Sequence, residues 1–432
     1  MKRLVWSELS EAQREEALAR PAMERSEELR GRVREIVAAV RQRGDAALRE
    51  LTERFDGVKL DSLQVSAVEI AAAQRLVKPE ILEAMQGAIG RLRAFHQAQV
   101  PADLRVETEE GVVCERRFSP IARVGLYIPG GTAPLPSTVM MLGVPSQIAA
   151  CPLRVLVTPP RKDGSIDPHI LAAASLLGLN QIYKAGGAQA IAALAYGTES
   201  IPKVDKIFGP GNSFVTEAKV QVAQDPRGAA LDLPAGPSEV LVIADASANP
   251  TFVASDLLSQ AEHGTDSQVV LISESQEAIS AILKQLEIQL SALPRRAIAA
   301  QALQHSCAIL SDDLLHAFEI SNRYAPEHLI LQTCDARAQA GWVRNAGSVF
   351  LGPYSPESVG DYSSGTNHVL PTYGFASAYS GVTTESFLKA ISFQELSAAG
   401  LQKIGPGVEL LAAVEGLEAH KNAVTLRLRS LE

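Results

Sequence analysis

The stretch QIYKAGGAQAIAALAYGT, residues 181–198, contains a complete strand–turn–helix unit and decides the fold of this part of the chain. A short strand runs into two glycines, and an alanine-rich helical segment follows. The same order of strand, short turn and helix occurs at residues 154–179 and again at residues 206–224. Repeated units of this kind place helices over the faces of a parallel sheet. The sequence therefore predicts a parallel α/β domain here.

A second alternation of strands and helices begins at Glu239, after a segment rich in Pro, Gly and Ala at residues 225–239. We predict an α/β fold with two incomplete Rossmann-like parallel-sheet domains, plus small N- and C-terminal helical or mixed domains. The expected strands of the second sheet are 239–245, 268–275, 307–312, 328–333 and 348–352. The expected domains are 1–24 as a helical segment, 25–126 packed with 238–378, 127–237 by itself, and 379–432.

The composition is that of a soluble globular protein. The chain has 432 residues, 46% apolar and 21% charged, with a net charge of −9. The acidic balance argues against binding nucleic acid or an anionic membrane, and no apolar run approaches the roughly 18 residues of a membrane span. The N-terminus is expected to form an amphipathic helix, capped by Ser10 with Gln13, and not a signal peptide. We therefore expect a cytoplasmic protein.

Three polar residues mark turns of the first α/β unit. Tyr127 ends a strand in GLYIPGG, Gln189 starts a helix after two glycines, and Asn212 lies in FGPGNSF. Ligands of open α/β sheets bind beyond the carboxyl ends of the strands, and helix N-termini there suit a pyrophosphate. GPGNSF supplies only the first half of a G-x-G-x-x-G motif. A nucleotide site and ordinary tight turns both remain open on this pattern.

The second unit carries groups suited to acid–base chemistry. Glu327 and His328 are adjacent in RYAPEHL, where carboxyl and imidazole groups can divide the work of base and acid, although a solvated loop pair is the alternative. The loop GPYSPESVGDYSSGTNHVLPTYG, residues 352–374, holds Glu357, Asp361 and His368. A loop dense in functional groups and poor in apolar ones is typical of a functional site.

The stretch LLSQAEHGTD, residues 257–266, places Gln260 and His263 on one helical face and Glu262 off it. His420 stands near the C-terminus, close to Glu415. Two histidines with an aspartate and an amide oxygen would make an N/O shell for zinc. The alternatives are a polar helix end and unrelated surface histidines.

Taken together, the motifs LPAGPSEVLVIAD, LLSQAEHGTDSQ, RYAPEHL and GPYSPESVGDYSSGTNHVLPT closely resemble histidinol dehydrogenase, and GLYIPGG and FGPGNSFVTEAK are similar to it too. The resemblance covers essentially the whole chain. Thr265 replaces a common Pro and Ser363 a common Ala, neither at a functional position. It implies oxidation of L-histidinol to L-histidine in two NAD-dependent steps through L-histidinal, the last steps of histidine biosynthesis. It also implies a zinc-dependent homodimer with intertwined small domains.

The resemblance assigns roles to single residues. Glu327 and His328 would be the acid–base pair, with His328 the base for the alcohol and Glu327 activating the water that hydrates the aldehyde. Zinc, one ion per subunit, would orient the substrate. The implied zinc ligands are Gln260, His263, Asp361 and His420. The implied substrate contacts are Ser238, His328, His368, Glu415 and the zinc ligands. The implied NAD contacts are Tyr127, Gln189 and Asn212.

In this reading the domain at 127–237 binds NAD, the domain containing 238–378 binds zinc and substrate, and 379–432 forms the dimer. Glu415 and His420 would reach the site of the other subunit. Two rival enzyme classes stay open. One is a zinc hydrolase in which Glu327 activates zinc-bound water. The other is a thiol-dependent aldehyde dehydrogenase that uses Cys114 or Cys151.

Overall fold

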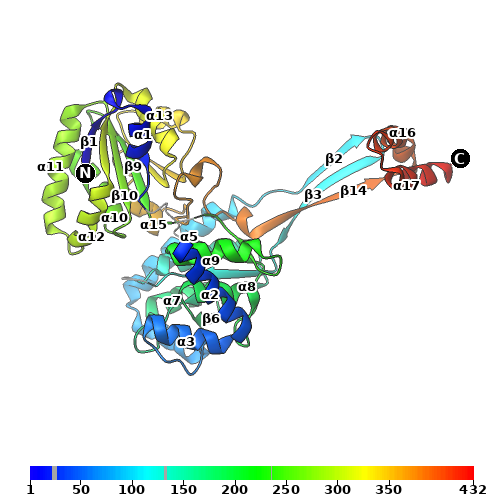
Figure 1. The fold of residues 1–432 in the computed structure, drawn as a ribbon, viewed down its shortest axis with the longest axis horizontal. Helices are drawn as coiled ribbons and strands as arrows, with labels where there is room; N and C mark the ends of the chain where they lie inside the picture. Colours follow the sequence, from blue (N-terminus) through cyan, green and yellow to red (C-terminus); the bar gives the residue numbers. More distant parts are fainter. Residues whose placement is uncertain (22–26, 131–133, 235) are drawn as a thin grey trace.

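The chain folds into two α/β domains and an extended arm that carries the C-terminus (Figure 1). The computed structural model describes residues 1–21, 27–130, 134–234 and 236–432. The predicted α/β class with two parallel sheets is confirmed. Within the described residues, no helix is long and apolar enough to cross a membrane. The expected boundary between residues 24 and 25 lies outside the described part.

The first domain is built on a five-stranded parallel sheet in the order β6-β5-β4-β7-β8. Its strands are β4 (Arg123–Tyr127), β5 (Leu153–Thr158), β6 (Gln181–Lys184), β7 (Lys206–Phe208) and β8 (Ala230–Leu231). Its helices are α6 (Pro136–Ile148), α7 (Pro168–Leu176), α8 (Gly187–Tyr196) and α9 (Ser213–Gln224). The strand order changes direction between β4 and β7, so the switch point of the sheet lies there.

The helices before this domain pack on it, which corrects the expected grouping of 25–126 with 238–378. They are α2 (Glu27–Arg43), α3 (Asp45–Asp56), α4 (Ala67–Leu76) and α5 (Pro79–Gln97). Helix α2 packs against α8 and α9, α4 against α7, and α5 against α6. Leu48 and Leu51 share a buried cluster with Ile191 and Leu194. An apolar stripe shows that a helix is buried, but it does not reveal which sheet covers it.

The second domain has a six-stranded parallel sheet in the order β1-β11-β10-β9-β12-β13. The strands are β1 (Lys2–Val5), β9 (Glu239–Ala244), β10 (Gln268–Ser273), β11 (Cys307–Leu310), β12 (His328–Gln332) and β13 (Ser348–Leu351). The helices are α1 (Glu11–Leu18), α10 (Pro250–Ala261), α11 (Gln276–Ala292), α12 (Arg296–Ala302), α13 (Leu314–Tyr324), α14 (Ala336–Gln339) and α15 (Glu357–Tyr362).

The N-terminal segment belongs to this second domain. The predicted capping box of Ser10 and Gln13 is present at the start of α1. Residues 2–5 form an edge strand paired with β11, where a helix was expected. Four residues are too few to show a period, so only pairing with the sheet identifies the strand.

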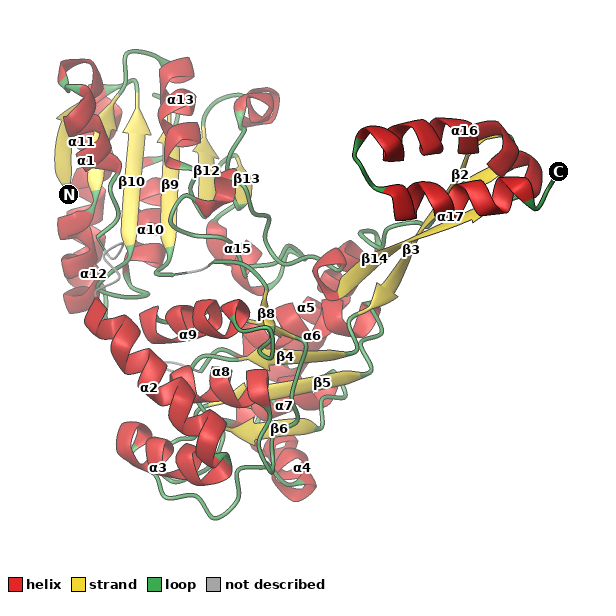
Figure 2. Cartoon of the chain, turned by 45° about the vertical axis from the view of Figure 1, so that its right-hand side comes forward, coloured by secondary structure: helices red, strands yellow, loops and turns green. Residues whose placement is uncertain are grey.

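The arm is an antiparallel sheet tipped by two helices, and it projects away from both domains (Figures 1 and 2). Its strands are β2 (Leu104–Glu109), β3 (Val112–Pro120) and β14 (Leu388–Leu396), in the order β14-β3-β2. Its helices are α16 (Ala398–Val414) and α17 (Glu418–Arg429). Residues 104–120 therefore belong with the C-terminal arm, which corrects the prediction that they join residues 238–378. Pairing between such distant segments leaves no local signal.

Candidate active site

The reactive residues of the second domain gather at the amino ends of its strands, the edge that faces the first domain (Figure 2). Glu327 precedes β12, His328 begins it, and Glu239 begins the neighbouring strand β9. Helix α10 ends at the same edge with Gln260, because it leads into β10. The sequence rule that sends ligands to the carboxyl ends of strands does not hold for this sheet.

Glu327 and His328 are both held by the backbone of Glu239. The main-chain N–H of Glu239 donates to Oε2 of Glu327 at 2.8 Å, and its carbonyl oxygen lies 3.0 Å from Nδ1 of His328. Nδ1 also lies 3.5 Å from Oε2 of Glu327. Gly347 lets the chain pass closely, since a Cβ there would lie 2.6 Å from the carbonyl oxygen of Glu327. The two predicted acid–base residues thus share one anchored, buried position.

The surroundings of Glu327 and His328 shift the pKa values of both groups. Burial raises the pKa of Glu327, against the opposing effect of His328. Burial disfavours the charged form of His328, but the carboxylates of Glu357 and Glu327 outweigh it and raise the pKa of His328 well above its ordinary value. A cation bound beside these carboxylates would oppose this shift and favour the neutral ring.

Gln260 is buried, with 1% of its surface exposed, and it keeps one free acceptor. Its Nε2 donates to the carbonyl oxygen of Glu239 at 3.2 Å and lies 3.3 Å from Nδ1 of His328. Among the described residues, its Oε1 has no hydrogen-bond partner. An unpartnered buried amide oxygen is costly unless a ligand satisfies it.

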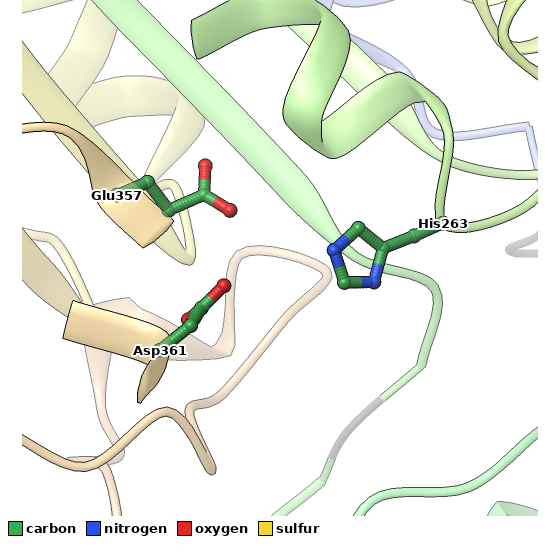
Figure 3. A group of neighbouring side chains, drawn as sticks. All are labelled: His263, Glu357 and Asp361. Carbon is green, nitrogen blue, oxygen red and sulfur yellow. The ribbon is translucent and has the colours of Figure 1, made fainter. Parts of the chain in front are cut away.

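Two carboxylates and an imidazole lie close together at this amino edge of the second sheet. Ligand atoms of His263, Glu357 and Asp361 all lie within 4.8 Å of one another, the acids from α15 and the histidine from the end of α10 (Figure 3). Glu262, next to His263, is not one of this group. Oδ1 of Asp361 lies 3.8 Å from Nε2 of His328. Burial raises the pKa of Glu357 to about 8, and its Oε2 has no hydrogen-bond partner within the described part of the chain.

This donor set fits a divalent cation such as zinc. Crowded carboxylates repel one another unless a positive charge lies between them, and N/O ligands from His, Asp and Glu are typical of zinc. The free Oε1 of Gln260 adds an amide oxygen at the same edge. Of the four predicted ligands, the fold brings His263 and Asp361 together, and Gln260 lies at the same edge, where His328 contacts it and faces Asp361. Glu357, which the sequence placed in a functional loop without a role, joins them; its i,i+4 spacing to Asp361 was the available signal.

Two predicted substrate contacts border the cluster. His368 places Nδ1 3.0 Å from the carbonyl oxygen of Asp361 and Nε2 3.2 Å from Oγ1 of Thr138 on α6, so it bridges the two domains. Burial lowers the pKa of His368, which favours the neutral ring. Ser238 is half-buried directly before β9, next to Glu239.

Glu415 and His420 do not reach this cluster within the chain. Glu415 caps the end of α16 and His420 lies in α17, both exposed on the distant arm (Figure 1). The fold therefore separates them from the other predicted site residues by the length of the arm.

The predicted cofactor residues gather at the carboxyl edge of the first sheet. The hydroxyl of Tyr127 accepts from the N–H of Gly187 at 3.2 Å, and Gln189 lies one turn into the same helix α8. Oδ1 of Asn212 accepts from the N–H of Val215 at 3.1 Å and so caps α9. A Cβ on Gly209 would lie 2.1 Å from the carbonyl oxygen of Tyr127, so only glycine allows this close approach. Residue 131 of the GLYIPGG motif lies outside the described part.

Two parallel-sheet domains that meet at a cluster of buried acid, imidazole and amide groups define a two-domain α/β enzyme. A family model described as histidinol dehydrogenase matches residues 19–428. Curated histidinol dehydrogenases are 59% identical in Xanthomonas euvesicatoria pv. vesicatoria, with 99% of each chain covered, and 56% identical in Xylella fastidiosa, with 100% of each covered. The crystal structure of histidinol dehydrogenase from Elizabethkingia anophelis has a TM-score of 0.95 at 49% identity and covers 100% of this chain and 98% of that one.

The chain belongs to the histidinol dehydrogenase family and is an oxidoreductase. Membership implies a place in histidine biosynthesis.

Proposed function

We propose that this chain oxidises L-histidinol to L-histidine through L-histidinal, with two molecules of NAD⁺ reduced in turn. In the first step the alcohol loses a hydride and a proton and becomes the aldehyde. In the second step water adds to the aldehyde, and the resulting gem-diol loses a hydride and a proton to give the acid. Both steps act on one carbon, so one site needs a base for the alcohol and a base for the water.

His328 is the proposed base for the alcohol. A carbonyl oxygen can only accept, so the contact between Nδ1 and Glu239 places a proton on Nδ1 and turns Nε2 toward the cluster. Nε2 is buried and has no hydrogen-bond partner among the described residues. An imidazole nitrogen in that position can take the hydroxyl proton of a substrate lying over the cluster.

Glu327 is the proposed base for the water. Its Oε2 is occupied by the N–H of Glu239, which fixes the carboxylate beside His328. Burial raises the pKa of this carboxyl, so the carboxylate is a stronger base than an exposed one. The two bases differ in environment, which suits a division of the two proton transfers between them.

The proposed zinc ligands are Gln260, His263 and Asp361 of one chain and His420, with Glu357 facing the same cluster. When bound, zinc would orient histidinol through the imidazole and amine nitrogens of that substrate. Its positive charge would also offset the carboxylate charge around His328. The proposed NAD site is the carboxyl edge of the first sheet, at Tyr127, Gln189 and Asn212. When bound, NAD accepts the hydride of each step.

A homodimer with shared sites is part of the proposal. Glu415 and His420 are exposed on an arm whose helices also expose large apolar side chains. The exposed set on these helices includes Val408, Leu410, Leu411, Val414, Leu417 and Leu426. Such a surface favours burial against another chain, and a two-fold partner would bring its own Glu415 and His420 to the site. Ser238, His368 and the partner's Glu415 would then contact the substrate.

The single observation that carries the proposal is the meeting of Glu327, His328, Gln260, His263, Glu357 and Asp361 at one edge in a member of this family. The test is NADH formation from L-histidinol, with and without a chelator. We expect two NADH per histidinol, loss of activity on chelation, and recovery with zinc. Histidinol binding of unchanged affinity by metal-free protein would contradict the orienting role of the metal.

The rival thiol mechanism is disfavoured by the positions of the two cysteines. Cys151 is buried, and burial raises the pKa of its thiol to about 11, far from a reactive thiolate. Cys114 lies on β3 in the arm. The rival hydrolase would leave the residues at the carboxyl edge of the first sheet without a role. Turnover of an amide without NADH formation would favour it.

A further inference from the structure

We infer that Arg20 and Glu239 are positioning residues for the Glu327–His328 pair. The inference rests on the proposed function for its catalytic meaning, and on hydrogen bonds of the described residues for its geometry. Both residues act through the backbone of Glu239, which contacts the groups proposed to carry out the proton transfers.

The backbone of Glu239 contacts three site side chains at once. Its N–H donates to Glu327 at 2.8 Å, and its carbonyl oxygen accepts from Nε2 of Gln260 at 3.2 Å and faces Nδ1 of His328 at 3.0 Å. These groups belong to the two peptide units on either side of the Glu239 Cα, so a shift of this one residue would displace the carboxylate, the imidazole and the amide together. The position of the Glu239 backbone therefore sets the geometry of the acid–base pair.

The side chain of Glu239 is fixed from the opposite side. Nε and Nη2 of Arg20 donate to its two oxygens at 2.7 and 3.0 Å, and the N–H of Tyr373 donates to Oε1 at 2.8 Å. Glu239 is 2% exposed, so this fork–fork pair is shielded from water. Paired N–H···O bonds of this kind restrict orientation as well as distance.

Arg20 is itself held rigidly by Tyr324. The guanidinium lies over the ring, with Cζ 3.9 Å from the centroid, and Nη2 donates to the Tyr324 carbonyl oxygen at 2.7 Å. The Tyr324 hydroxyl in turn donates to Gln268 at 2.8 Å. Arg20 thus transmits a fixed position from the body of the domain to Glu239. Burying a charged pair gives little stability by itself, so a positioning role explains its presence better.

The first variant is Arg20→Lys, which keeps the charge but loses the planar fork. We expect kcat for histidinol to fall by about 10- to 100-fold, since misplacement of a reacting group by about 1 Å is worth up to about 100-fold. KM should change less than about threefold, because the proposed substrate contacts of His263, Asp361 and His368 do not depend on the backbone of Glu239. Glu239→Gln should lower kcat in the same way. The double variant should have a kcat no lower than that of the more impaired single variant, because both changes break the same interaction.

The matched control is Arg123→Lys. Arg123 makes an equivalent fork to Asp205, at 3.1 and 2.5 Å, on the surface of the first domain. Its kcat should stay within about twofold of the parent chain. Equal losses of kcat in Arg20→Lys and Arg123→Lys would show a general effect on folding and overturn the inference.

A second readout does not depend on the substrate. In protein labelled with ¹⁵N-histidine, the Nδ1–H signal of His328, assigned by its absence from His328→Asn, should shift or exchange faster with water in Arg20→Lys. An unchanged signal together with parental kcat would overturn the inference. If the parent chain makes no NADH from histidinol, the proposed function fails, while this signal still decides the positioning role.

Discussion

The two parallel sheets of this chain use opposite edges. The first sheet gathers Tyr127, Gln189 and Asn212 where its strands end, and the second gathers Glu327 and His328 where its strand β12 begins. The folds are otherwise alike, with helices packed on parallel strands. The comparison teaches that the chemistry of an edge follows from which helix ends meet there.

At the carboxyl edge of a parallel sheet, the following helices present their N-termini. Helices α8 and α9 begin there, and their free N–H groups and positive dipole ends suit an anionic cofactor. At the amino edge, the preceding helices present their C-termini. Helix α10 ends there, beside two carboxylates and a free amide oxygen, and its negative dipole end suits a cation. In the proposed function, the two edges divide cofactor and metal binding between them.

The largest effect is expected at the amino edge. His328→Asn should lower kcat by about 10²- to 10⁴-fold, the usual worth of a general base, while the Kd for NAD stays unchanged. Steady-state kinetics measure kcat, and a binding titration measures the Kd for NAD.

Glu327→Gln should mainly slow oxidation of histidinal. Loss of histidinol oxidation with histidinal oxidation spared would reverse the two assignments.

The next effect tests whether the amino edge is completed by the arm of a second chain. His420→Asn and Glu327→Gln chains, unfolded and refolded together, should regain about a quarter of the parental rate of histidinal oxidation, because half of the random dimers carry one intact site of two. Each variant refolded alone is the control. Absence of recovery, with mixed dimers demonstrated, would place the whole site in one chain.

A smaller effect is expected at the carboxyl edge. Asn212→Ala removes the cap of α9 and should raise the KM for NAD about 5- to 10-fold with little change in zinc affinity. Asn249→Ala is the matched control, since Asn249 caps α10 through the N–H of Thr251 at 2.9 Å in the other domain. Both variants should lose about 1 kcal/mol of stability, and only the first should weaken NAD binding. Equal KM values for NAD in Asn212→Ala and Asn249→Ala would contradict NAD binding at this edge.

The smallest effect concerns the seam between the domains. His96 on α5 is completely buried and contacts Asn367, which also donates to the carbonyl oxygen of Met141 at 2.7 Å, so the loop that bears His368 is tied to the first domain. Burial lowers the pKa of His96 to about 4, from 6.5. On unfolding, the ring takes up a proton between those values, so this contribution to stability is present above pH 6.5 and is lost as the pH falls toward 4.

The loss amounts to about 3 kcal/mol for this single group. His96→Gln should remove that part of the pH dependence, measured by denaturant unfolding between pH 4 and 7. His169→Gln, which changes a half-buried histidine of the same domain, is the control. If the free energy of unfolding depends on pH in the same way after His96→Gln, a group other than His96 causes that dependence.

The α/β class and the order of strands and helices after residue 120 follow from the sequence alone, and so do most of the residues that meet at the amino edge of the second sheet. These features are local, because a strand, a glycine turn and a helix each leave their own pattern. Glu357 lay in the correct loop but gained a role only when α15 placed it beside Asp361. Arg20 carried no signal, since its partner Glu239 lies 219 positions away.

Only the tertiary structure decided which domain the helices α2 to α5 join, that residues 104–120 build the arm with β14, and that Glu415 and His420 stand apart from the rest of the site. The physical reason is that burial is not directional. An apolar face or an unpaired strand edge needs a partner, but its residues do not specify which one. That choice is made by the packing of the whole chain, and it is also what brings Gln260, His263 and Asp361 to one edge of a sheet.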